Sequence, residues 1–306
     1  MPVTNKSITF FYFLASVFAA LASYRIHLEG LEASVFPIFD AITNFTGRAP
    51  DQYRILPYMI IQGIRKLLEI VTAQAISPKY PILIFDACFL FFSAVLLDRT
   101  FSRLPIRAIT GVLILLYPFL MFDGYRPTGS FILCLSSLAA LLIYREDLPA
   151  RKAGFMVLLI VISFTRADVA LLAALVGISM MNLRPWAKIM AVIIPLLIQI
   201  FLSAVIFADA VYFSQVIMLA DNFTGRYLIY SPLTYLVAAS LYCYWTEIQH
   251  FLIQAWHQRR GAIIPILGYG AALFVIARPN EYRLFLPLLP FVLLLMNMQR
   301  IAADGE

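Results

Sequence analysis

The chain has 306 residues, of which 62% are hydrophobic and only 13% are charged, with a net charge of +6. Soluble domains average about 45–50% apolar and about 25% charged residues, so this composition excludes a soluble enzyme, a disordered chain and a fibrous repeat. The apolar runs are continuous rather than alternating, which excludes an outer-membrane barrel. The sequence therefore predicts an all-α fold, a polytopic integral membrane helix bundle whose residues 1–306 form a single transmembrane domain.

Ten apolar stretches predict about ten transmembrane helices, provided that several of them extend into their flanking residues. The first follows Lys6 and is interpreted as an uncleaved span, because no convincing small-residue cleavage site comes after it. Residues 53–71 are apolar but carry four charged side chains, which is typical of an amphipathic helix in the membrane interface, and 246–260 show the same character. The predicted spans are 8–24, 81–97, 108–122, 128–144, 153–165, 169–183, 189–208, 231–245, 262–277 and 284–298.

The distribution of Lys and Arg predicts the orientation, because these residues concentrate in short cytoplasmic loops. With the N-terminus in the cytoplasm, the cytoplasmic segments hold 12 Lys and Arg residues and the short external loops hold 5. Residues 25–80 then form a long first external loop, and 246–260 form a cytoplasmic interfacial helix. We expect a bacterial inner (plasma) membrane, with the basic charge facing anionic lipid and no nucleic acid as partner.

The predicted external segments pair acidic residues with Arg, whereas the cytoplasmic segments are mostly basic. Arg166 and Asp168 lie in a short connection between two apolar runs, where charges are costly unless they pair or face a wet cavity. Arginine offers a forked donor suited to phosphate, and a nearby carboxylate can act as a general base. We therefore expect one polar cavity on this face. Its candidate residues are Asp40, Asp51, Arg54, Asp123, Arg126, Arg166, Asp168, Arg278, Glu281 and Arg283.

Asp86 is separate, because it falls inside the predicted span 81–97. An intramembrane carboxyl is a functional candidate, either as a proton relay or as a protonated group that bonds a neighbouring helix. The three cysteines lie singly in apolar runs without metal-binding spacing. No nucleotide-binding or zinc-protease motif is present, so no nucleotide or zinc chemistry is visible.

Several short motifs resemble the GT-C superfamily of polytopic glycosyltransferases, and its mannosyltransferases in particular. The sequence of 51–57 (DQYRILP) is similar to the aromatic/Arg-x-x-Pro entry to the second span of bacterial members. Residues 123–127 (DGYRP), after Pro118, resemble their Pro-then-acidic turn, and 164–168 (FTRAD) resemble their T-R-x-D/G turn. Residues 280–290 (NEYRLFLPLLP) look like the late H-x-E-x-R-F-x-x-P-x-x-P element.

The resemblance implies transfer of a sugar from a polyprenyl-phosphate donor to an acceptor on the non-cytoplasmic face. Arg166, Arg278 and Arg283 would hold the donor phosphate and stabilise the leaving group. Asp40 would deprotonate the acceptor hydroxyl, with Asp51 as the alternative base. Arg54, Asp123, Arg126, Asp168 and Glu281 would support the polar cavity. No resident cofactor or metal is implied, although members of the family differ in their need for a divalent metal. The sequence names neither the sugar nor the acceptor.

Two other functions fit the same pattern. A polysaccharide polymerase or ligase acting on undecaprenyl-linked glycans also needs external Arg residues, but is expected to carry a larger late external loop than 209–230. A lipid or solute transporter needs polar or broken helices near the membrane midplane, and Asp86, Pro118 and Pro195 supply some of these. Both alternatives stay open at this point.

Overall fold

The computed structural model describes residues 5–46, 54–101, 104–120, 125–145, 149–208, 239, 242–276 and 282–303. Within these ranges the chain is helical, with no strand. The described elements are α1 (Asn5–His27), α2 (Glu32–Thr43), α3 (Ile55–Thr72), α4 (Lys79–Phe101), α5 (Leu104–Leu120), α6 (Thr128–Tyr144), α7 (Pro149–Ser163), α8 (Ala167–Met180), α9 (Pro185–Phe201), η2 (Leu202–Ile206), α13 (Trp245–Ile276), η3 (Tyr282–Leu284) and α14 (Leu288–Ala303).

Three of the described helical segments are long and apolar enough to cross a membrane: Lys6–His27, Lys79–Phe101 and Pro185–Ile206. Four shorter apolar helices lie within α5, α6, α8 and α14. The predicted all-helical, membrane-associated architecture is therefore confirmed. About ten crossings remain a prediction, and most of the predicted span 231–245 lies outside the described residues.

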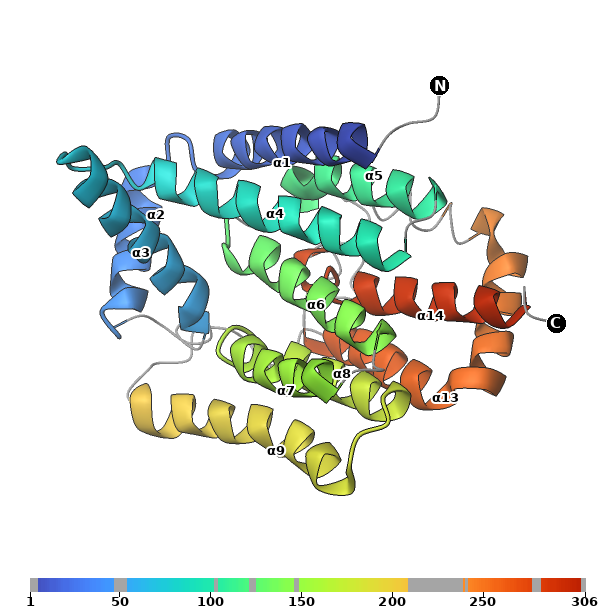
Figure 1. The fold of residues 1–306 in the computed structure, drawn as a ribbon. Coiled ribbons are helices and arrows are strands. Elements are labelled where there is room, and N and C mark those ends of the chain that lie inside the picture. The colour runs from blue at the N-terminus through green and yellow to red at the C-terminus, as the bar shows by residue number, and fades with distance from the viewer. Residues whose placement is uncertain are drawn as a thin grey trace.

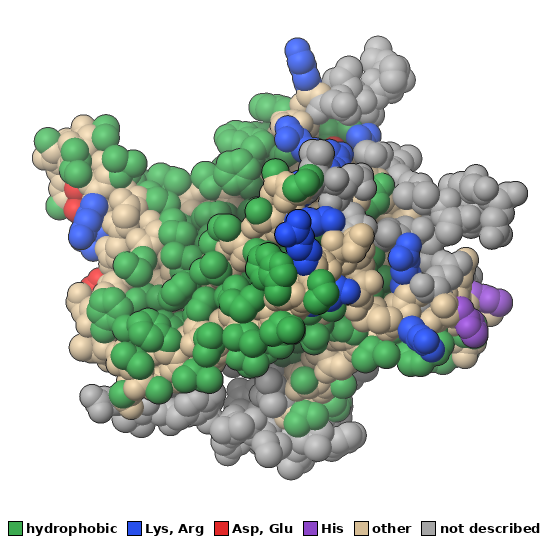
Figure 2. Space-filling view, turned by 60° about the horizontal axis from the view of Figure 1, so that its bottom comes forward, with side chains coloured by type: hydrophobic (Ala, Val, Ile, Leu, Met, Phe, Trp, Pro, Cys, Tyr) green, Lys and Arg blue, Asp and Glu red, His purple; other side chains and the backbone are tan. Residues whose placement is uncertain are grey.

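Figure 1 shows how the bundle is arranged. The axes of helices α1, α4, α9 and α14 are roughly parallel across the picture, whereas α2 and α3 lie across the left end, where α4 begins. The first half of α13 lies across the opposite end, where α1 begins and α14 ends. In Figure 2 hydrophobic side chains cover the middle of the visible face, and most of its Lys and Arg lie toward the end that carries His. On this face the two ends therefore differ in charge.

The helices outside the long spans agree with the predicted boundaries. Helix α3 (Ile55–Thr72) occupies the stretch predicted as an amphipathic helix over 53–71. Helix α13 contains one residue with non-helical dihedrals, Arg259, at φ −140° and ψ 36°. This break lies one residue before the end of the predicted interfacial helix 246–260, close to the start of the predicted span 262–277. Trp245 and Trp256 in the first half are about half exposed, as membrane-surface anchors are.

Small side chains allow the central helices to approach one another closely. Gly177 of α8 faces Phe155 of α7, whose ring is fully buried. Helix α6 is buried along most of its length and uses small residues for the same purpose. Its buried small residues are Gly129, Ser130, Cys134, Ser136, Ser137, Ala139 and Ala140.

Gly177→Ala is expected to destabilise the α7–α8 contact. A Cβ at this position would lie 2.5 Å from Cζ of the Phe155 ring, and such overpacking costs about 1–3 kcal/mol. This cost equals or exceeds the roughly 1 kcal/mol by which alanine stabilises a helix interior relative to glycine. Thermal unfolding of the purified protein should show a lower midpoint. Gly154→Ala in α7 is the control, because nothing lies within 4 Å of its Cβ position. Equal midpoints for the two variants would contradict the prediction.

Candidate functional site

The turn between α7 and α8 places two charged side chains at the end of the bundle. After α7 ends at Ser163, the Arg166 amide donates to the Ile162 carbonyl at 2.6 Å. Helix α8 begins at the next residue, so Asp168 lies in its first turn, where a negative charge interacts favourably with the helix dipole. Arg166 is 6% exposed, whereas the Asp168 side chain is 44% exposed.

Arg166, Asp168 and Tyr269 form one closed cluster, which we call the Arg166 cluster. The Arg166 guanidinium donates to both oxygens of Asp168, from Nε to Oδ1 at 3.2 Å and from Nη2 to Oδ2. The same Nη2 donates to the Tyr269 hydroxyl at 2.7 Å, and that hydroxyl donates to Asp168 Oδ2 at 2.8 Å. Bidentate pairs of this kind fix the orientation of the guanidinium, and Tyr269 ties α8 to α13.

Arg54 brings a second guanidinium close to the Arg166 cluster. It lies at the N-cap of α3, near enough to Asp168 and Tyr269 to influence both electrostatically. Two cations and one carboxylate therefore meet where the start of α3, the start of α8 and α13 approach one another. A place where two guanidinium groups approach one another suits an anionic ligand.

An apolar groove of about 210 Å³ is lined in part by side chains that neighbour Arg54 and Arg166 in the sequence. Its lining includes Ile55, which follows Arg54, and Phe164, which is two residues before Arg166. Phe45 also lines the groove and has a positive φ of 61°, a strained conformation for a bulky residue. Its ring stacks on Phe207 with centroids 5.7 Å apart. Strained backbone of this kind tends to occur at functional sites.

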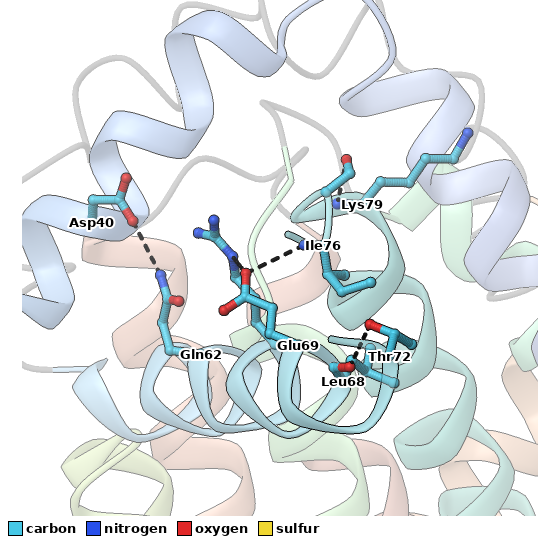
Figure 3. Close-up of polar contacts among 9 residues, drawn as sticks. Asp40, Gln62, Leu68, Glu69, Thr72, Ile76 and Lys79 are labelled. Atoms are coloured by element: carbon cyan, nitrogen blue, oxygen red, sulfur yellow. Dashed lines mark hydrogen bonds and ion pairs between the residues drawn. The ribbon is translucent and has the colours of Figure 1, made fainter. Parts of the chain in front are cut away.

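Asp40 lies on α2, which packs against α3 at the same end of the bundle. Its carboxylate Oδ1 accepts a hydrogen bond of 3.1 Å from Gln62 Nε2 (Figure 3). Asp40 is exposed to solvent. Farther along α3, Glu69 accepts from Arg65 Nε at 3.1 Å and from the Ile76 amide at 3.3 Å, which fixes the turn leading to α4.

The start of α2 is held by Glu32. Its Oε1 accepts a bond of 2.9 Å from the Tyr24 hydroxyl of α1. Backbone N–H bonds at the helix start, followed by this hydroxyl, lower the pKa of Glu32, so the carboxylate is ionised at neutral pH. Lys79 lies over the Tyr24 ring, with Nζ 5.0 Å from its centroid. These contacts join α1, α2 and α4 and so position the helix that carries Asp40.

A second, buried polar cluster lies deeper, and we call it the Asp86 cluster. Asp86 of α4 is 1% exposed, and its Oδ1 accepts a hydrogen bond of 2.5 Å from Ser130 Oγ of α6. Tyr117 of α5 and Tyr125, just before α6, are equally buried and interact electrostatically with this carboxyl. Arg283 of η3 lies near enough to Tyr117 to influence it.

An aromatic layer connects the predicted site residues with the Asp86 cluster. Phe39, next to Asp40, packs edge-on against Tyr58 at 4.8 Å and stacks on Tyr125 at 6.2 Å between centroids. Helix α2 therefore lies directly against the segment that leads into α6.

No protein-family model, curated protein or solved structure matches this chain. The chemistry of the site therefore has to be interpreted from its own geometry.

The structure brings some of the predicted site residues together. Arg54, Arg166 and Asp168 gather at one place, Asp40 lies on the neighbouring α2–α3 pair, and Arg283 lies beside the Asp86 cluster. Arg126 is half-buried in the turn before α6, with Nη1 bonded to the Tyr125 carbonyl at 3.2 Å. The four other predicted residues lie outside the described part of the chain: Asp51, Asp123, Arg278 and Glu281.

Two features of the site were not predicted from the sequence. Tyr269 belongs to the Arg166 cluster although it is 101 residues from Asp168 in the sequence. Ser130 donates a hydrogen bond to Asp86, which is 44 residues away in the sequence. A tyrosine or serine inside an apolar run carries no local signal for such a contact. Among the described residues, no group of three or more His, Cys, Asp and Glu side chains could hold a metal ion.

Proposed function

We propose that this protein is a GT-C-like membrane glycosyltransferase, which transfers a sugar from a polyprenyl-phosphate donor to an acceptor on the non-cytoplasmic face. We also propose about ten crossings, a bacterial inner (plasma) membrane and a cytoplasmic N-terminus. The observation that carries the proposal is the Arg166 cluster with Arg54, together with an apolar groove lined in part by their neighbours in the sequence. A polyprenyl phosphate has the matching chemistry, because it joins an anionic head to a hydrocarbon tail.

The two arginines are well placed for such a donor. Each is within two residues of a side chain that lines the groove, Ile55 for Arg54 and Phe164 for Arg166. A phosphate near Arg54 and Arg166 would thus have apolar surface next to it for the first isoprene units. Asp168 and Tyr269 hold the Arg166 fork in place, so little reorganisation is needed when the donor binds.

Transfer in this proposal is a direct displacement. Asp40 takes the proton of the acceptor hydroxyl, whose oxygen attacks the anomeric carbon of the sugar. The bond between that carbon and the phosphate oxygen breaks, its electron pair stays on the polyprenyl phosphate, and the anomeric configuration inverts. The arginines stabilise the charge that develops on the leaving phosphate.

The remaining predicted residues keep their proposed roles. Arg278 and Arg283 are further candidates for holding the phosphate, and Asp51 is the alternative base. Arg126, Asp123 and Glu281 would support the cavity. Arg283 lies beside Tyr117 rather than in the Arg166 cluster's hydrogen-bond network, so a role in phosphate binding requires the two clusters to open onto one cavity.

A transfer assay tests the function directly. The purified protein in liposomes is expected to move a radiolabelled hexose from polyprenyl phosphate to a bacterial envelope lipid or glycan extract, and to do so far less from nucleotide sugars. This follows from the lack of a nucleotide-binding motif and the apolar groove. Transfer from nucleotide sugars alone, or from neither donor across a panel of hexoses, would overturn the proposal.

A transporter is the second candidate, because one observation favours it. Asp86 is a buried carboxyl inside a helix long enough to span the membrane, and such groups often mark proton or solute pathways. If uptake into proteoliposomes depends on Asp86 while Asp40→Asn has no effect, the transporter gains over the transferase.

A further inference from the structure

The Asp86 cluster takes no part in the proposed transfer reaction, and its carboxyl lies deep inside the helix bundle. Asp86 lies seven residues into α4, which at about 1.5 Å per residue is roughly 10 Å from the start of the helix. Its carboxyl is 1% exposed and packs against Ser130, which is fully buried. This is therefore a carboxyl in the interior of the bundle and not at its surface.

The described groups that hydrogen-bond Asp86 directly are neutral. Ser130 donates to Oδ1 at 2.5 Å. The Tyr125 hydroxyl interacts with the same carboxyl as a hydrogen-bonding partner, and the Tyr117 hydroxyl interacts with Ser130 in the same way. Both tyrosines are 1% exposed or less. Buried hydroxyl groups are thus the hydrogen-bonding neighbours of this carboxyl within the described residues.

Charged groups do not reach the carboxyl in the described part of the chain. Of the helices that pack on α4, α5 contributes Tyr117, and α3 contributes Tyr58 beside Tyr125. Arg283, just before α14, acts on Tyr117. No Lys, Arg or His side chain from α1 or α6 is in contact with Asp86 within the described residues.

An ionised carboxylate in this place would be expensive. Burial of a charge costs several kcal/mol unless an opposite charge compensates it, and hydroxyl donors alone compensate only part of that cost. A neutral carboxyl avoids the cost. Its Oδ1 accepts the hydrogen bond from Ser130, and its own O–H can donate a hydrogen bond to a neighbouring hydroxyl oxygen.

We propose that Asp86, with Ser130, Tyr117 and Tyr125, forms a buried proton-binding site in which Asp86 holds a proton at neutral pH. Release of this proton to water leaves an ionised carboxylate buried between α4, α5 and α6. The site therefore links proton binding to the packing of these three helices. Because Tyr125 stacks on Phe39, it also links proton binding to α2, which carries Asp40.

The proposal fixes the sign of a pH effect. The unfolded chain loses the Asp86 proton near pH 4, where exposed aspartates titrate, while the folded protein retains it. The folded state then binds one more proton, so its stability falls as pH rises, by up to about tenfold in the folding equilibrium per pH unit. Asp86→Asn cannot ionise and should remove this part of the pH dependence.

Infrared spectroscopy of the full-length protein in nanodiscs tests the proposal. At neutral pH the wild type is expected to show a carboxylic-acid C=O band that Asp86→Asn lacks. Asp98→Asn is the matched control in the same helix, because Asp98 pairs with Arg107 at 2.6 Å; this variant should keep the band. If Asp86→Asn does not fold, wild-type protein with isotopically labelled aspartate still shows whether any aspartate is protonated at neutral pH, as the proposal requires.

Two results would overturn the proton site. One is a wild-type spectrum at neutral pH without a protonated aspartate. The other is a thermal stability that rises with Na⁺ but not with K⁺ or choline and loses this dependence in Asp86→Asn, because a bound cation would then compensate an ionised Asp86. Neither result depends on sugar transfer, so failure here leaves the proposed function standing.

Discussion

Arg166→Lys is expected to lower sugar transfer from the polyprenyl-phosphate donor by about 10²–10³-fold, the usual cost of losing one preorganised donor to the developing charge. Lysine keeps the charge but loses the planar fork. Arg166 donates through two nitrogens to Asp168 and through Nη2 to Tyr269 as well, and a single ammonium cannot reproduce that geometry. The measurement is kcat/KM in liposomes at saturating acceptor.

The control for this variant is Arg25→Lys. Arg25 forms an exposed pair with Glu29 at 3.3 Å, with 78% of its side chain exposed, and pairs of this kind contribute little. Its activity should match the wild type. Tyr269→Phe removes only one hydroxyl from the Arg166 cluster and should give an intermediate loss. Full activity of Arg166→Lys would remove Arg166 from the phosphate site.

Hydropathy predicted the helices well, because a membrane-spanning helix needs a long apolar run whatever it packs against. Helices α1 and α4 each include a predicted span and extend beyond both of its ends. Helix α9 begins before the predicted span 189–208 and ends at Phe201, and η2 continues the segment to Ile206. The charged residues within 53–71 predicted an amphipathic helix, and the chain has a separate helix there. The predicted change from an interfacial helix over 246–260 to a span over 262–277 coincides with a break at Arg259. Crossing number depends on segments outside the described residues, so it is still a prediction.

The site was less predictable, because contacts between distant helices leave no mark in the local sequence. Arg166 and Asp168 are two residues apart, so their pairing could be expected from a short connection between apolar runs. Tyr269 could not be expected, because an aromatic residue in an apolar run is equally suited to lipid. The same holds for Ser130, which could have bonded its own helix backbone, as Ser137 does with the Leu133 carbonyl at 2.7 Å.

Asp40→Asn is expected to lower sugar transfer by about 10²–10⁴-fold, the usual contribution of a general base. Asparagine keeps the size and the hydrogen bond from Gln62 but cannot take the acceptor's proton. Asp40 is exposed, so the fold should not depend on its charge. The variant should retain the unfolding temperature of the wild type and its affinity for polyprenyl phosphate. The measurement is kcat from single-turnover transfer, with donor binding followed separately.

Glu29→Gln is the matched control for Asp40→Asn, because it removes an exposed carboxylate just before α2 and outside the proposed site. It should leave both binding and transfer unchanged. Loss of donor binding in Asp40→Asn would show that Asp40 supports the site's shape and is not the base. Unchanged transfer would shift the base to another carboxylate, and Asp51 would be the next residue to test. A base is distinguished from a structural residue by this separation alone: transfer falls while the donor still binds, because only proton removal has been lost.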